Sequence, residues 1–553
     1  MTLFGKMFPA AAIGLLATLV VTPTVLGEHT RASARSDATE VRQKGTVAVA
    51  VSTLATENFV PRMNAGGELP VDFAWGEPLI IMDRGYRSLR PNIATNWTLK
   101  RVGSKWVWHF KMRQGVRFNE GKGPVTARDV QFTFSQCLLP DTINNGCPIL
   151  KSAIDNDIKN FRIINPYEFK LYSEVAVPAL PTFLSNGSTK AFPILPSAYY
   201  SRVGDSGFAA HPIGAGPFIF KSQVRGQSVT LEAVRKHFRA TPSFETLKFI
   251  IAPEAATRLA MLRSGAAQIA VLDVPQLPQI QAARLKPIVI HNTGNLYFNL
   301  GGQFYDMPEK NCPSCPWVGS SRNALRVREA LSLAIDRRAL RRALFLGSGQ
   351  LSAVPFSWTP GPYAYNDRKW KPPAYNPARA KSLLAQAGLQ SGLTIRVPLV
   401  TGFPLLPNIY DVAEAVASYW EAIGITVKRV AVPWTSFRSS ALVNRNTAGL
   451  AFPTVTAKTD DPLTDLERNF SRTGAATYLD NQEFDRVIDQ AKNLVDPRKR
   501  AALSRKLGAY IIKERLGIPL LSLNTILAAT PKVRYTPMAG NVLFGTFEYV
   551  KLK

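Results

Sequence analysis

Four cysteines are the residues of this sequence whose spacing points most directly to chemistry. Cys137 and Cys147 flank a turn-rich stretch, and Cys312 and Cys315 form the motif C-P-S-C in a proline-rich loop. Such pairs serve as disulfides, as thioredoxin-like redox centres or as zinc ligands. A redox pair belongs at a strand-to-helix turn, and a four-cysteine zinc site needs both pairs spaced as CxxC. We therefore expect two local disulfides, Cys137–Cys147 and Cys312–Cys315, and an oxidising compartment.

The sequence lacks the patterns of common hydrolases and nucleotide-binding proteins. It has no HExxH zinc motif and no GxSxG nucleophile turn, and residues 120–123 lack the GK[ST] ending of a phosphate-binding loop. The acidic pairs Asp155/Asp157 and Asp460/Asp461 fit surface turns better than a calcium site. We therefore predict a protein that is not an enzyme and that holds no cofactor or metal. A secreted enzyme with an unrecognised site is the alternative.

Residues 1–34 have the pattern of a secretory signal peptide and its leader. Lys6 supplies a small basic region, an apolar run covers residues 7–26, and cleavage is expected after Gly27 or Ala34. An uncleaved membrane anchor is the alternative, because the apolar run is close to the ~20 residues that a membrane span needs. No cysteine for lipid attachment lies nearby, and no later segment resembles a transmembrane helix. We therefore expect a periplasmic location.

The chain is strongly basic, with 67 Lys and Arg residues against 39 Asp and Glu residues and a net charge of +28. Such a charge raises the question of nucleic-acid binding. The basic residues are spread, however, and the densest runs, 326–342 and 498–506, alternate with apolar residues at helical spacing. These runs predict solvated helix faces. We expect no nucleic-acid partner, and the charge suits solubility in the periplasm, a nearby anionic membrane or an acidic medium.

The elements that must position any site alternate between strands and helices. Residues 106–113 alternate as a hairpin strand, with Trp106, Trp108, Phe110 and Met112 on one face, and Thr126 with Asp129 predicts a helix start of the capping-box type. Residues 161–172 predict a hairpin, and residues 248–272 a β–α–β unit. Further segments are the strands 45–52, 394–400 and 425–432 and the helices 322–345, 377–388, 411–423, 484–495 and 497–514. This alternation indicates an α/β fold.

Several of these segments resemble, in the same order, the motifs of one protein family. They are WVWHFKMRQGVRFNEGKGPVTARDVQFTF, PIGAGPF, RLAMLRSGAAQIAV, RVREALSLAIDRRAL, YNPARAKSLLAQAGL and SYWEAIGITVKRVAVPW. The family is that of the solute-binding receptors of ABC importers of the peptide/nickel type, the bacterial extracellular solute-binding proteins of family 5. The resemblance covers residues 46–526, nearly all of the expected mature chain.

The resemblance implies a bilobal fold like that of periplasmic binding proteins of class II, with an additional inserted domain and two lobes joined by a hinge. Lobe I would combine residues 45–78, 205–295 and 527–553, the inserted domain would be residues 79–204, and lobe II would be residues 296–526. The lobes would close on a ligand in the cleft between them. In this frame Asp336, Arg337 and Arg338 are expected to make helix-surface contacts.

The resemblance also implies a function. The chain would capture peptides or peptide-like small solutes and deliver them, as a monomer, to an inner-membrane ABC permease with its ATPase subunits. Receptors for opine-like or other anionic organic solutes use the same frame, and this ligand class is the alternative.

In peptide receptors of this family an Asp holds the free amine of the ligand, and the matching segment here is Gly449–Leu463. Aligned on Asp461-Pro462 without a gap, the segment has Lys458 in place of that Asp. A lysine there would repel an ammonium and attract a carboxylate or phosphate, or it would simply face solvent. A gap of two residues would instead put Asp460 at the amine position.

The resemblance points to aromatic residues for the rest of the site. Dipeptide receptors offer an Arg to the ligand carboxylate at a position that Phe403 occupies here, counting back from Trp420. Trp434 and Phe437 follow the strand before the cleft segment, and either a wall of the cleft or core packing would explain them. With both termini of a dipeptide unmatched, we expect an anionic or modified ligand.

Overall fold

The computed structural model describes residues 43–553 except 65–67, 86–87, 145, 189–191, 357–366, 368, 391, 404–405, 458–461, 473, 475–478, 480 and 539–545. The expected signal peptide and leader, residues 1–34, therefore lie outside the described part of the chain. Among the described residues, no helix combines the length and the apolar character that crossing a bilayer requires.

The two largest clusters of buried apolar side chains in the described chain are called here the first and the second core. The first core joins side chains between Val47 and Ile290 to others between Leu527 and Val550. The second core lies between Leu296 and Leu523. Both ends of the described chain therefore contribute to the first core, whereas the second core is built from one continuous stretch.

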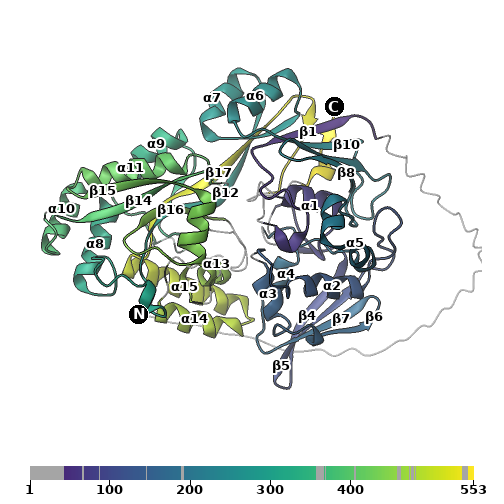
Figure 1. Ribbon diagram of the computed structural model, residues 1–553, viewed down its shortest axis with the longest axis horizontal. Coiled ribbons are helices and arrows are strands. Elements are labelled where there is room, and N and C mark those ends of the chain that lie inside the picture. The colour runs from purple at the N-terminus through teal and green to yellow at the C-terminus, as the bar shows by residue number, and fades with distance from the viewer. Residues whose placement is uncertain are drawn as a thin grey trace, which may run out of the picture. The chain divides into compact units, whose positions relative to one another are not determined.

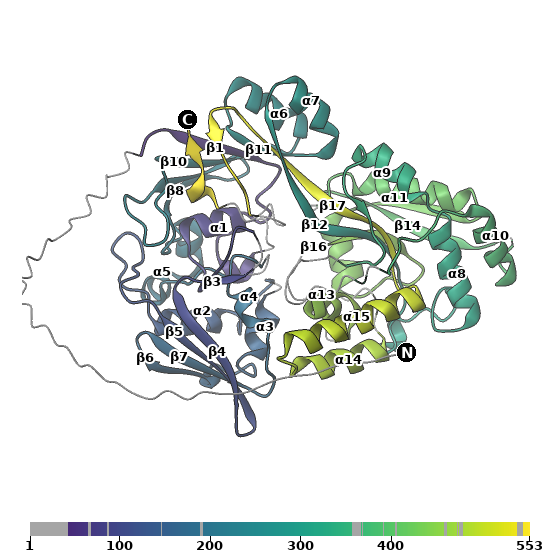
Figure 2. The same ribbon diagram turned by 180° about the vertical axis from the view of Figure 1, so that it is seen from behind.

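One sheet of nine strands belongs to both cores, in the order β16-β12-β17-β11-β1-β10-β9-β8, with β13 added on β17 (Figures 1 and 2). The strand β1 lies parallel to β10 and β11, and the other neighbouring strands of this sheet pair antiparallel. The bounds are β1 (Thr46–Val51), β8 (Phe218–Val224), β9 (Ser228–Ala233), β10 (Thr246–Ile251), β11 (Ile269–Leu272), β12 (Lys286–Leu300), β13 (Gln350–Leu351), β16 (Ala451–Ala457) and β17 (Ile518–Ala529).

Strands β12 and β17 form a ribbon that passes from the first core to the second. In one half of the ribbon, 286–290 pairs with 525–529, and β11 lies beside β17. In the other half, 294–298 pairs with 518–523, and β16 lies beside β12. The register shifts between the two halves, at residues 290–294, so the ribbon carries a bulge where it leaves the first core.

A sheet of four strands and several helices complete the first core. The strand order is β4-β5-β7-β6. The bounds are β4 (Ala94–Val102), β5 (Lys105–Met112), β6 (Phe161–Asn165) and β7 (Glu168–Ser173), with β2 (Ile80–Met82), β3 (Leu89–Pro91), α1 (Leu69–Trp75), α2 (Ala127–Gln136), α3 (Cys147–Ser152), α4 (Leu180–Phe183) and α5 (Ser197–Ala210). The helices α6 (Ala255–Ser264) and α7 (Leu277–Ala282) instead pack with residues of β1, β11 and β17 in a smaller, separate cluster. The short elements η1 (Pro61–Met63), η2 (Ile158–Asn160) and η3 (Val274–Gln276) lie between them.

The strand–turn–helix unit predicted from residues 106–134 is confirmed. In β5 the side chains of Trp108, Phe110 and Met112 are buried, and Phe110 stacks on Phe169 of β7 at 5.0 Å between ring centroids. Helix α2 begins after Thr126, whose backbone N–H donates to Asp129 Oδ2 at 2.9 Å, as the capping box requires. The predicted hairpin at 161–172 and the β–α–β unit at 248–272 are confirmed as well.

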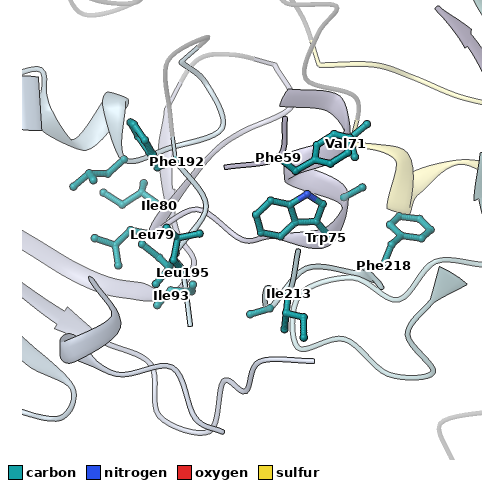
Figure 3. Packing of buried hydrophobic residues seen from close by; sticks show 14 of the residues in the cluster. Phe59, Val71, Trp75, Leu79, Ile80, Ile93, Phe192, Leu195, Ile213 and Phe218 are labelled. Atoms are coloured by element: carbon teal, nitrogen blue, oxygen red, sulfur yellow. The ribbon is translucent and has the colours of Figure 1, made fainter. Parts of the chain in front are cut away.

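The motif PIGAGPF owes its glycines to close packing against helix α1. Trp75 at the end of α1 is fully buried, and Figure 3 shows it beside Phe59, Val71 and Phe218. A Cβ atom on Gly216 would lie 2.4 Å from the carbonyl carbon of Trp75, and the Gly216 N–H donates to the Trp75 carbonyl at 2.9 Å. Glycine is required here because any side chain would push the segment before β8 away from the helix.

The last residues of the chain close the first core. The strands β18 (Val533–Arg534) and β19 (Lys551–Leu552) pair with each other, and η6 (Phe547–Tyr549) lies between them. The Phe547 ring lies 5.7 Å from that of Tyr535 and 5.3 Å from that of Phe249 in β10. The core next to β10 is therefore completed by the C-terminal residues.

The second core is an α/β arrangement in which helices surround short strands (Figure 1). Strands β14 (Thr394–Thr401) and β15 (Thr426–Pro433) pair in parallel, and Trp420 of α11 packs edge-on against Phe298 of β12. The helices are α8 (Arg322–Leu333), α9 (Arg337–Phe345), α10 (Pro377–Gln386), α11 (Ile409–Glu421), α12 (Trp434–Phe437), α13 (Pro462–Phe470), α14 (Gln482–Lys492) and α15 (Pro497–Glu514), with η4 (Pro308–Lys310) and η5 (Arg438–Val443). The α/β fold predicted from the sequence is confirmed.

One expected helix is in fact two. The sequence predicts a single helix over 322–345, but α8 ends at Leu333 and α9 begins at Arg337. Asp336 caps α9, since its Oδ1 accepts from the N–H groups of Arg338 and Ala339 at 2.9 Å. Arg337 was expected at the surface, but it is 2% exposed and donates to the carbonyl oxygens of Ser332 and Ile335. Its guanidinium thereby satisfies the carbonyls that the end of α8 leaves open.

Candidate functional site

Strand β16 leads into the residues predicted to hold the ligand, and it ends beside the bulge of the ribbon. Lys458, Asp460 and Asp461 themselves lie outside the described residues. Strand β16 ends at Ala457, which pairs with Gly294 of β12. Because Gly294 is the first paired residue after the bulge, the strand that leads into this segment ends where the ribbon passes between the two cores.

The three aromatic residues proposed for the site lie together. Phe403 follows β14, and its ring meets Trp434 of α12 edge-on at 4.6 Å. Trp434 is 6.4 Å from Phe437, which in turn contacts Phe452 of β16 at 5.1 Å. Phe403 and Phe437 are each 4% exposed and belong to the second core, and Trp434 is half-buried against it. Phe403 and Phe437 thus pack within the second core, and their part in ligand binding stays a prediction.

A cluster of polar side chains at the bulge was not foreseen from the sequence. Asn292 has a left-handed backbone with φ of 55°, and its Oδ1 accepts from the hydroxyl of Ser522 at 2.8 Å. Asn524 Oδ1 accepts from the Asn292 N–H at 3.2 Å. The hydroxyl groups of Thr293 and Thr525 are 3.0 Å apart. These side chains take the place of the backbone ladder where its register shifts, and they join residues about 230 positions apart in the sequence.

Both predicted disulfides are present. Cys137 is bonded to Cys147, and Cys312 to Cys315, and the described chain has no free cysteine. No group of three or more His, Cys, Asp or Glu side chains that could hold a metal ion occurs among the described residues. In the structure the cysteines therefore serve as covalent links within the chain.

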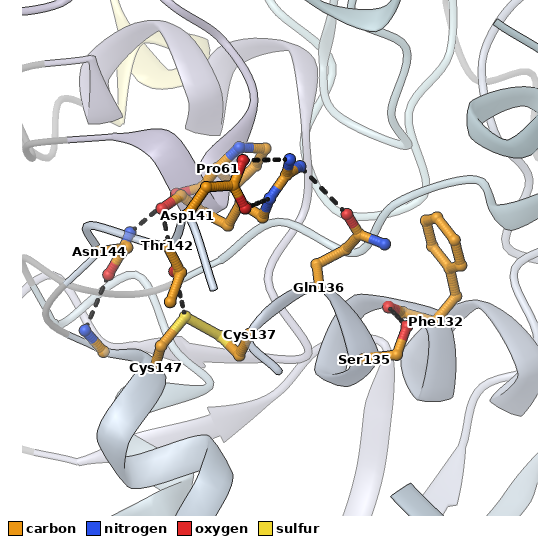
Figure 4. Close-up of a disulfide and its surroundings, with 11 residues drawn as sticks. Pro61, Phe132, Ser135, Gln136, Cys137, Asp141, Thr142, Asn144 and Cys147 are labelled. Atoms are coloured by element: carbon orange, nitrogen blue, oxygen red, sulfur yellow. Dashed lines mark hydrogen bonds and ion pairs between the residues drawn. A yellow bond between two sulfur atoms is a disulfide. The ribbon is translucent and has the colours of Figure 1, made fainter. Parts of the chain in front are cut away.

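The first disulfide closes a loop that contacts both the side chain and the backbone of Arg62. Figure 4 shows this disulfide with Asp141 and Asn144 of the loop. The Arg62 carbonyl accepts from the N–H groups of residues 143 and 144 at 3.0 Å, and its guanidinium Nη2 lies 2.9 Å from Asp141 Oδ2. A second carboxylate, Asp205 of α5, lies 2.5 Å from the same Nη2. Hydrogen bonding to Asp205 raises the pKa of Arg62, and the same bond lowers the pKa of Asp205.

A second buried ion network ties the C-terminal residues to the first core. Arg239 Nη2 lies 2.6 Å from Glu77 Oε1, and its Nη1 lies 2.5 Å from Glu548 Oε1. Burial by itself lowers the pKa of Arg239, but the charges of Glu77 and Glu548 outweigh it and raise that pKa. His237 lies against this network, with its Nε2 2.9 Å from the Ala215 carbonyl and 3.5 Å from Glu77. Burial lowers the pKa of His237, so the neutral ring donates to Ala215.

The second core holds its buried arginines mainly on backbone carbonyls. Arg337 donates from Nε to the Pro519 carbonyl at 2.7 Å and from Nη1 to the Ser332 carbonyl at 2.9 Å. Arg328 donates to the carbonyls of Trp317 and Glu514, and its nearest carboxylate oxygen, on Glu514, is 4.0 Å away. Burial lowers the pKa of Arg337 to about 9 and that of Arg328 to about 10.

Comparisons with known proteins agree on one family. The model of "Bacterial extracellular solute-binding proteins, family 5 Middle" matches residues 88–477. "Heme-binding protein A" of Haemophilus influenzae is 24% identical over 507 residues, which cover 84% of this chain and 85% of that protein. "Di/tripeptide-binding protein 1" of Pseudomonas aeruginosa is 26% identical over 486 residues, covering 83% and 84%.

A solved structure matches the fold over nearly the whole chain. It is the ABC transporter-associated periplasmic binding protein DppA from Helicobacter pylori in complex with the peptide STSA. The TM-score is 0.75 at 19% sequence identity, and the match covers 93% of this chain and 99% of that one.

Proposed function

Since the chain belongs to the bacterial extracellular solute-binding proteins of family 5, we propose that it captures a peptide or peptide-like small solute and hands it to an inner-membrane ABC permease. As a member of this family it is a solute-binding protein of an ABC transporter and not an enzyme. The proposal adds to this family role the class of the solute, the residues that bind it and the permease that receives it.

The course of the β12–β17 ribbon carries this proposal. Two separate cores joined by a bulged ribbon can move relative to each other, and a ligand held between them is released when they part. The strand β16, which directly precedes the candidate residues 458–461 in the sequence, ends at this ribbon, opposite Gly294. A ligand contacting that segment and the facing residues of the first core would link the two cores, so its binding energy would favour the closed arrangement.

We propose the division into lobes that the family frame implies: lobe I with residues 45–78, 205–295 and 527–553, the inserted domain 79–204, and lobe II with 296–526. The described contacts support the main division, because the first core draws on both ends of the described chain and the second core on one stretch. The inserted domain shares the first core with lobe I, and we therefore expect the two to move as one body.

The ligand class follows from Lys458 in the proposed alignment. A lysine in the cleft would bind a carboxylate or phosphate and would disfavour a free amine. Relatives of this chain are named for di/tripeptides and for heme, so the frame accepts different ligands. An acidic or modified peptide derivative would agree with the peptide ligands of relatives and with a positive charge at Lys458. An opine-like or other anionic organic solute is the second candidate.

The test is to identify the solute that the protein carries. Native mass spectrometry of the full chain, purified without denaturation, should show a bound mass that is released on unfolding. Titration calorimetry with a neutral dipeptide, an acidic dipeptide and its N-blocked form then ranks the classes. Tightest binding of the acidic or blocked form supports the proposal. Equal binding of the neutral dipeptide contradicts the anionic ligand and leaves the receptor role standing.

The role of Lys458 is tested by charge reversal. Lys458→Glu should weaken binding of the acidic dipeptide by more than tenfold, about 1.4 kcal/mol. Lys428→Glu is the matched control, because Lys428 is an exposed residue of β15 and carries the same change of charge. A neutral dipeptide bound equally well by the wild type and by Lys458→Ala would refute the contact.

We propose a periplasmic location with cleavage after Gly27 or Ala34. N-terminal sequencing of the protein released by osmotic shock should give one of these two new ends. Full-length protein in the membrane fraction would support the uncleaved anchor instead.

A further inference from the structure

A hydrogen bond joins the two cores outside the ribbon. The backbone N–H of Ala176, in the segment between β7 and α4, donates to the side-chain Oδ1 of Asn493 at 2.9 Å. Asn493 is the C-cap residue of α14. Figures 1 and 2 both draw the end of α14 beside α3, away from the ribbon and from α6 and α7. The two residues are 317 positions apart in the sequence, so this contact forms only when the cores are brought together.

The donor side of this contact is fixed by the first core. The Ala176 carbonyl accepts from Trp108 Nε1 at 3.0 Å, and Trp108 is a buried residue of β5. The Ser173 hydroxyl donates to the Val175 carbonyl at 2.7 Å. The peptide before Ala176 and the peptide after it are thus both held, and the Ala176 N–H is presented in one direction.

The acceptor side is fixed by the second core. Arg500 of α15 is 4% exposed, and its Nη1 donates to the carbonyls of Ala491 at 2.8 Å and Leu494 at 3.1 Å. These two carbonyls flank Asn493 on either side. The turn between α14 and α15 is therefore held by a buried guanidinium, and the Asn493 side chain projects from a rigid support.

Two rigid supports that meet through one hydrogen bond make a conformational latch. We propose that the Ala176–Asn493 hydrogen bond, hereafter the latch, holds the closed arrangement of the two cores while the ribbon serves as the pivot. The latch rests on the proposed function only in that closure is what captures the solute. It makes Asn493 a positioning residue, since it acts through the arrangement of the cores and not on the ligand.

The test measures closure directly in the ligand-free protein. The described cysteines are all in disulfides, so cysteines introduced at Asn96 of β4 and Arg505 of α15, both exposed, accept one spin label each. Pulsed electron–electron double resonance then gives the distribution of distances between the two spin labels. Loss of one net hydrogen bond, worth roughly 1 kcal/mol, predicts that Asn493→Ala raises the open-to-closed ratio about fivefold.

Two further variants separate the latch from a local role of Asn493 in α14. Asn493→Asp keeps the acceptor oxygen, so it should retain the wild-type distribution. If Asn493 only capped the helix, aspartate would be worse than alanine, because a negative charge is unfavourable at a helix C-terminus. Asn376→Ala removes a cap of α10 that makes no contact across the cores, and it should leave the distribution unchanged.

The outcomes distinguish the latch from the receptor role. A wild-type distribution without the short distance, an Asn493→Ala distribution equal to wild type, or opening by Asn493→Asp would each overturn the latch. None of these results bears on whether a solute is found by native mass spectrometry. Conversely, a protein that binds no solute would leave the distances, and hence the latch, fully measurable.

Discussion

Two arginines of the first core and two of the second are held in opposite ways, whereas Arg258 of α6, beside the first core, lies against backbone carbonyls as the second pair does. In the first core, Arg62 and Arg239 lie against carboxylates of Asp141, Asp205, Glu77 and Glu548. In the second core, Arg328 and Arg337 lie against backbone carbonyls. The carboxylates raise the pKa of the first pair, whereas burial lowers the pKa of the second pair.

This difference has a physical meaning for each core. A buried guanidinium beside a carboxylate is balanced by an opposite charge, so removing either partner leaves the other as an uncompensated buried charge. A guanidinium held by carbonyls is stabilised only by dipoles and has no opposite charge beside it. Its charged form therefore carries the desolvation cost of burial without compensation by a counter-ion. The first core is therefore sensitive to changes of charge, and the second core to changes of backbone geometry around its arginines.

The largest expected effect is that of Arg239→Met. The change leaves Glu77 and Glu548 buried without their common partner, and we expect a loss of about 3–5 kcal/mol in the free energy of unfolding. Denaturant unfolding followed by tryptophan fluorescence measures it. Arg162→Met, at an exposed residue of β6, is the control and should change stability by less than about 0.5 kcal/mol. A loss below about 1 kcal/mol for Arg239→Met would mean that the network is not balanced as described.

Arg337→Met should cost less, because it removes the buried charge together with its hydrogen bonds. The carbonyls of Ser332 and Pro519 lose their donor, and we expect a loss of about 2–3 kcal/mol. The same unfolding measurement applies, with the exposed neighbour in Arg338→Met as control. If Arg337→Met proved more damaging than Arg239→Met, the contrast between the cores would be reversed.

The two disulfides, one beside each core, allow a second comparison of stability, with smaller expected effects. Cys137–Cys147 closes a loop with a sequence separation of 10, and Cys312–Cys315 one with a separation of 3. In the chain-entropy view the longer loop contributes about 3 kcal/mol and the shorter about 2 kcal/mol. Replacing each pair by alanines should therefore destabilise the first core more than the second. Equal or inverted losses would show that loop length does not set the contribution of these bridges.

The smallest expected effect is on pH dependence. Burial lowers the pKa of His237 below its unfolded value of about 6.5, so the unfolded state binds the proton more tightly. Stability is then fully present above about pH 6.5 and is lost as the pH falls below it. The stretch 296–523 of the second core contains no histidine, so this loss should arise in the first core.

Unfolding midpoints measured between pH 8 and pH 5 test this dependence. His237→Gln should reduce the loss of stability between pH 8 and pH 5, because the group whose pKa is lowered by burial is removed. His211→Gln changes a more exposed histidine and serves as the control, with the slope expected to persist. An unchanged slope in His237→Gln would assign the acid sensitivity elsewhere.

Much of the fold was predictable because it depends on local patterns. The alternation in β5, the cap at Thr126 and the helix 497–514 are written in short stretches, and the structure has them. The helix 322–345 was wrong because the apolar period continues across the break, and only the cap at Asp336 with buried Arg337 ends one helix and starts the next. A single-sequence pattern cannot reveal a guanidinium turned inward.

The site was less predictable because it depends on residues far apart in the chain. The bulge cluster pairs Asn292 with Ser522 and Asn524, and no local pattern marks such a group. Phe403 on one side and Trp434 with Phe437 on the other were proposed on separate grounds, and that their rings contact one another had to come from the structure. Lys458, Asp460 and Asp461 stay predictions. The disulfides were foreseeable because each pair is close in sequence.

The closure of the first core by the C-terminal residues has a consequence for biosynthesis. Leu527, Tyr535, Phe547 and Val550 belong to the same cluster as Val47 and Val49, which leave the ribosome hundreds of residues earlier. Contacts at such sequence separation form late, because the chain entropy lost in joining distant segments must be offset before they stabilise anything. A nascent chain therefore cannot complete its first core until residues 527–550 have been synthesised, whereas all residues of the second core are available by Leu523.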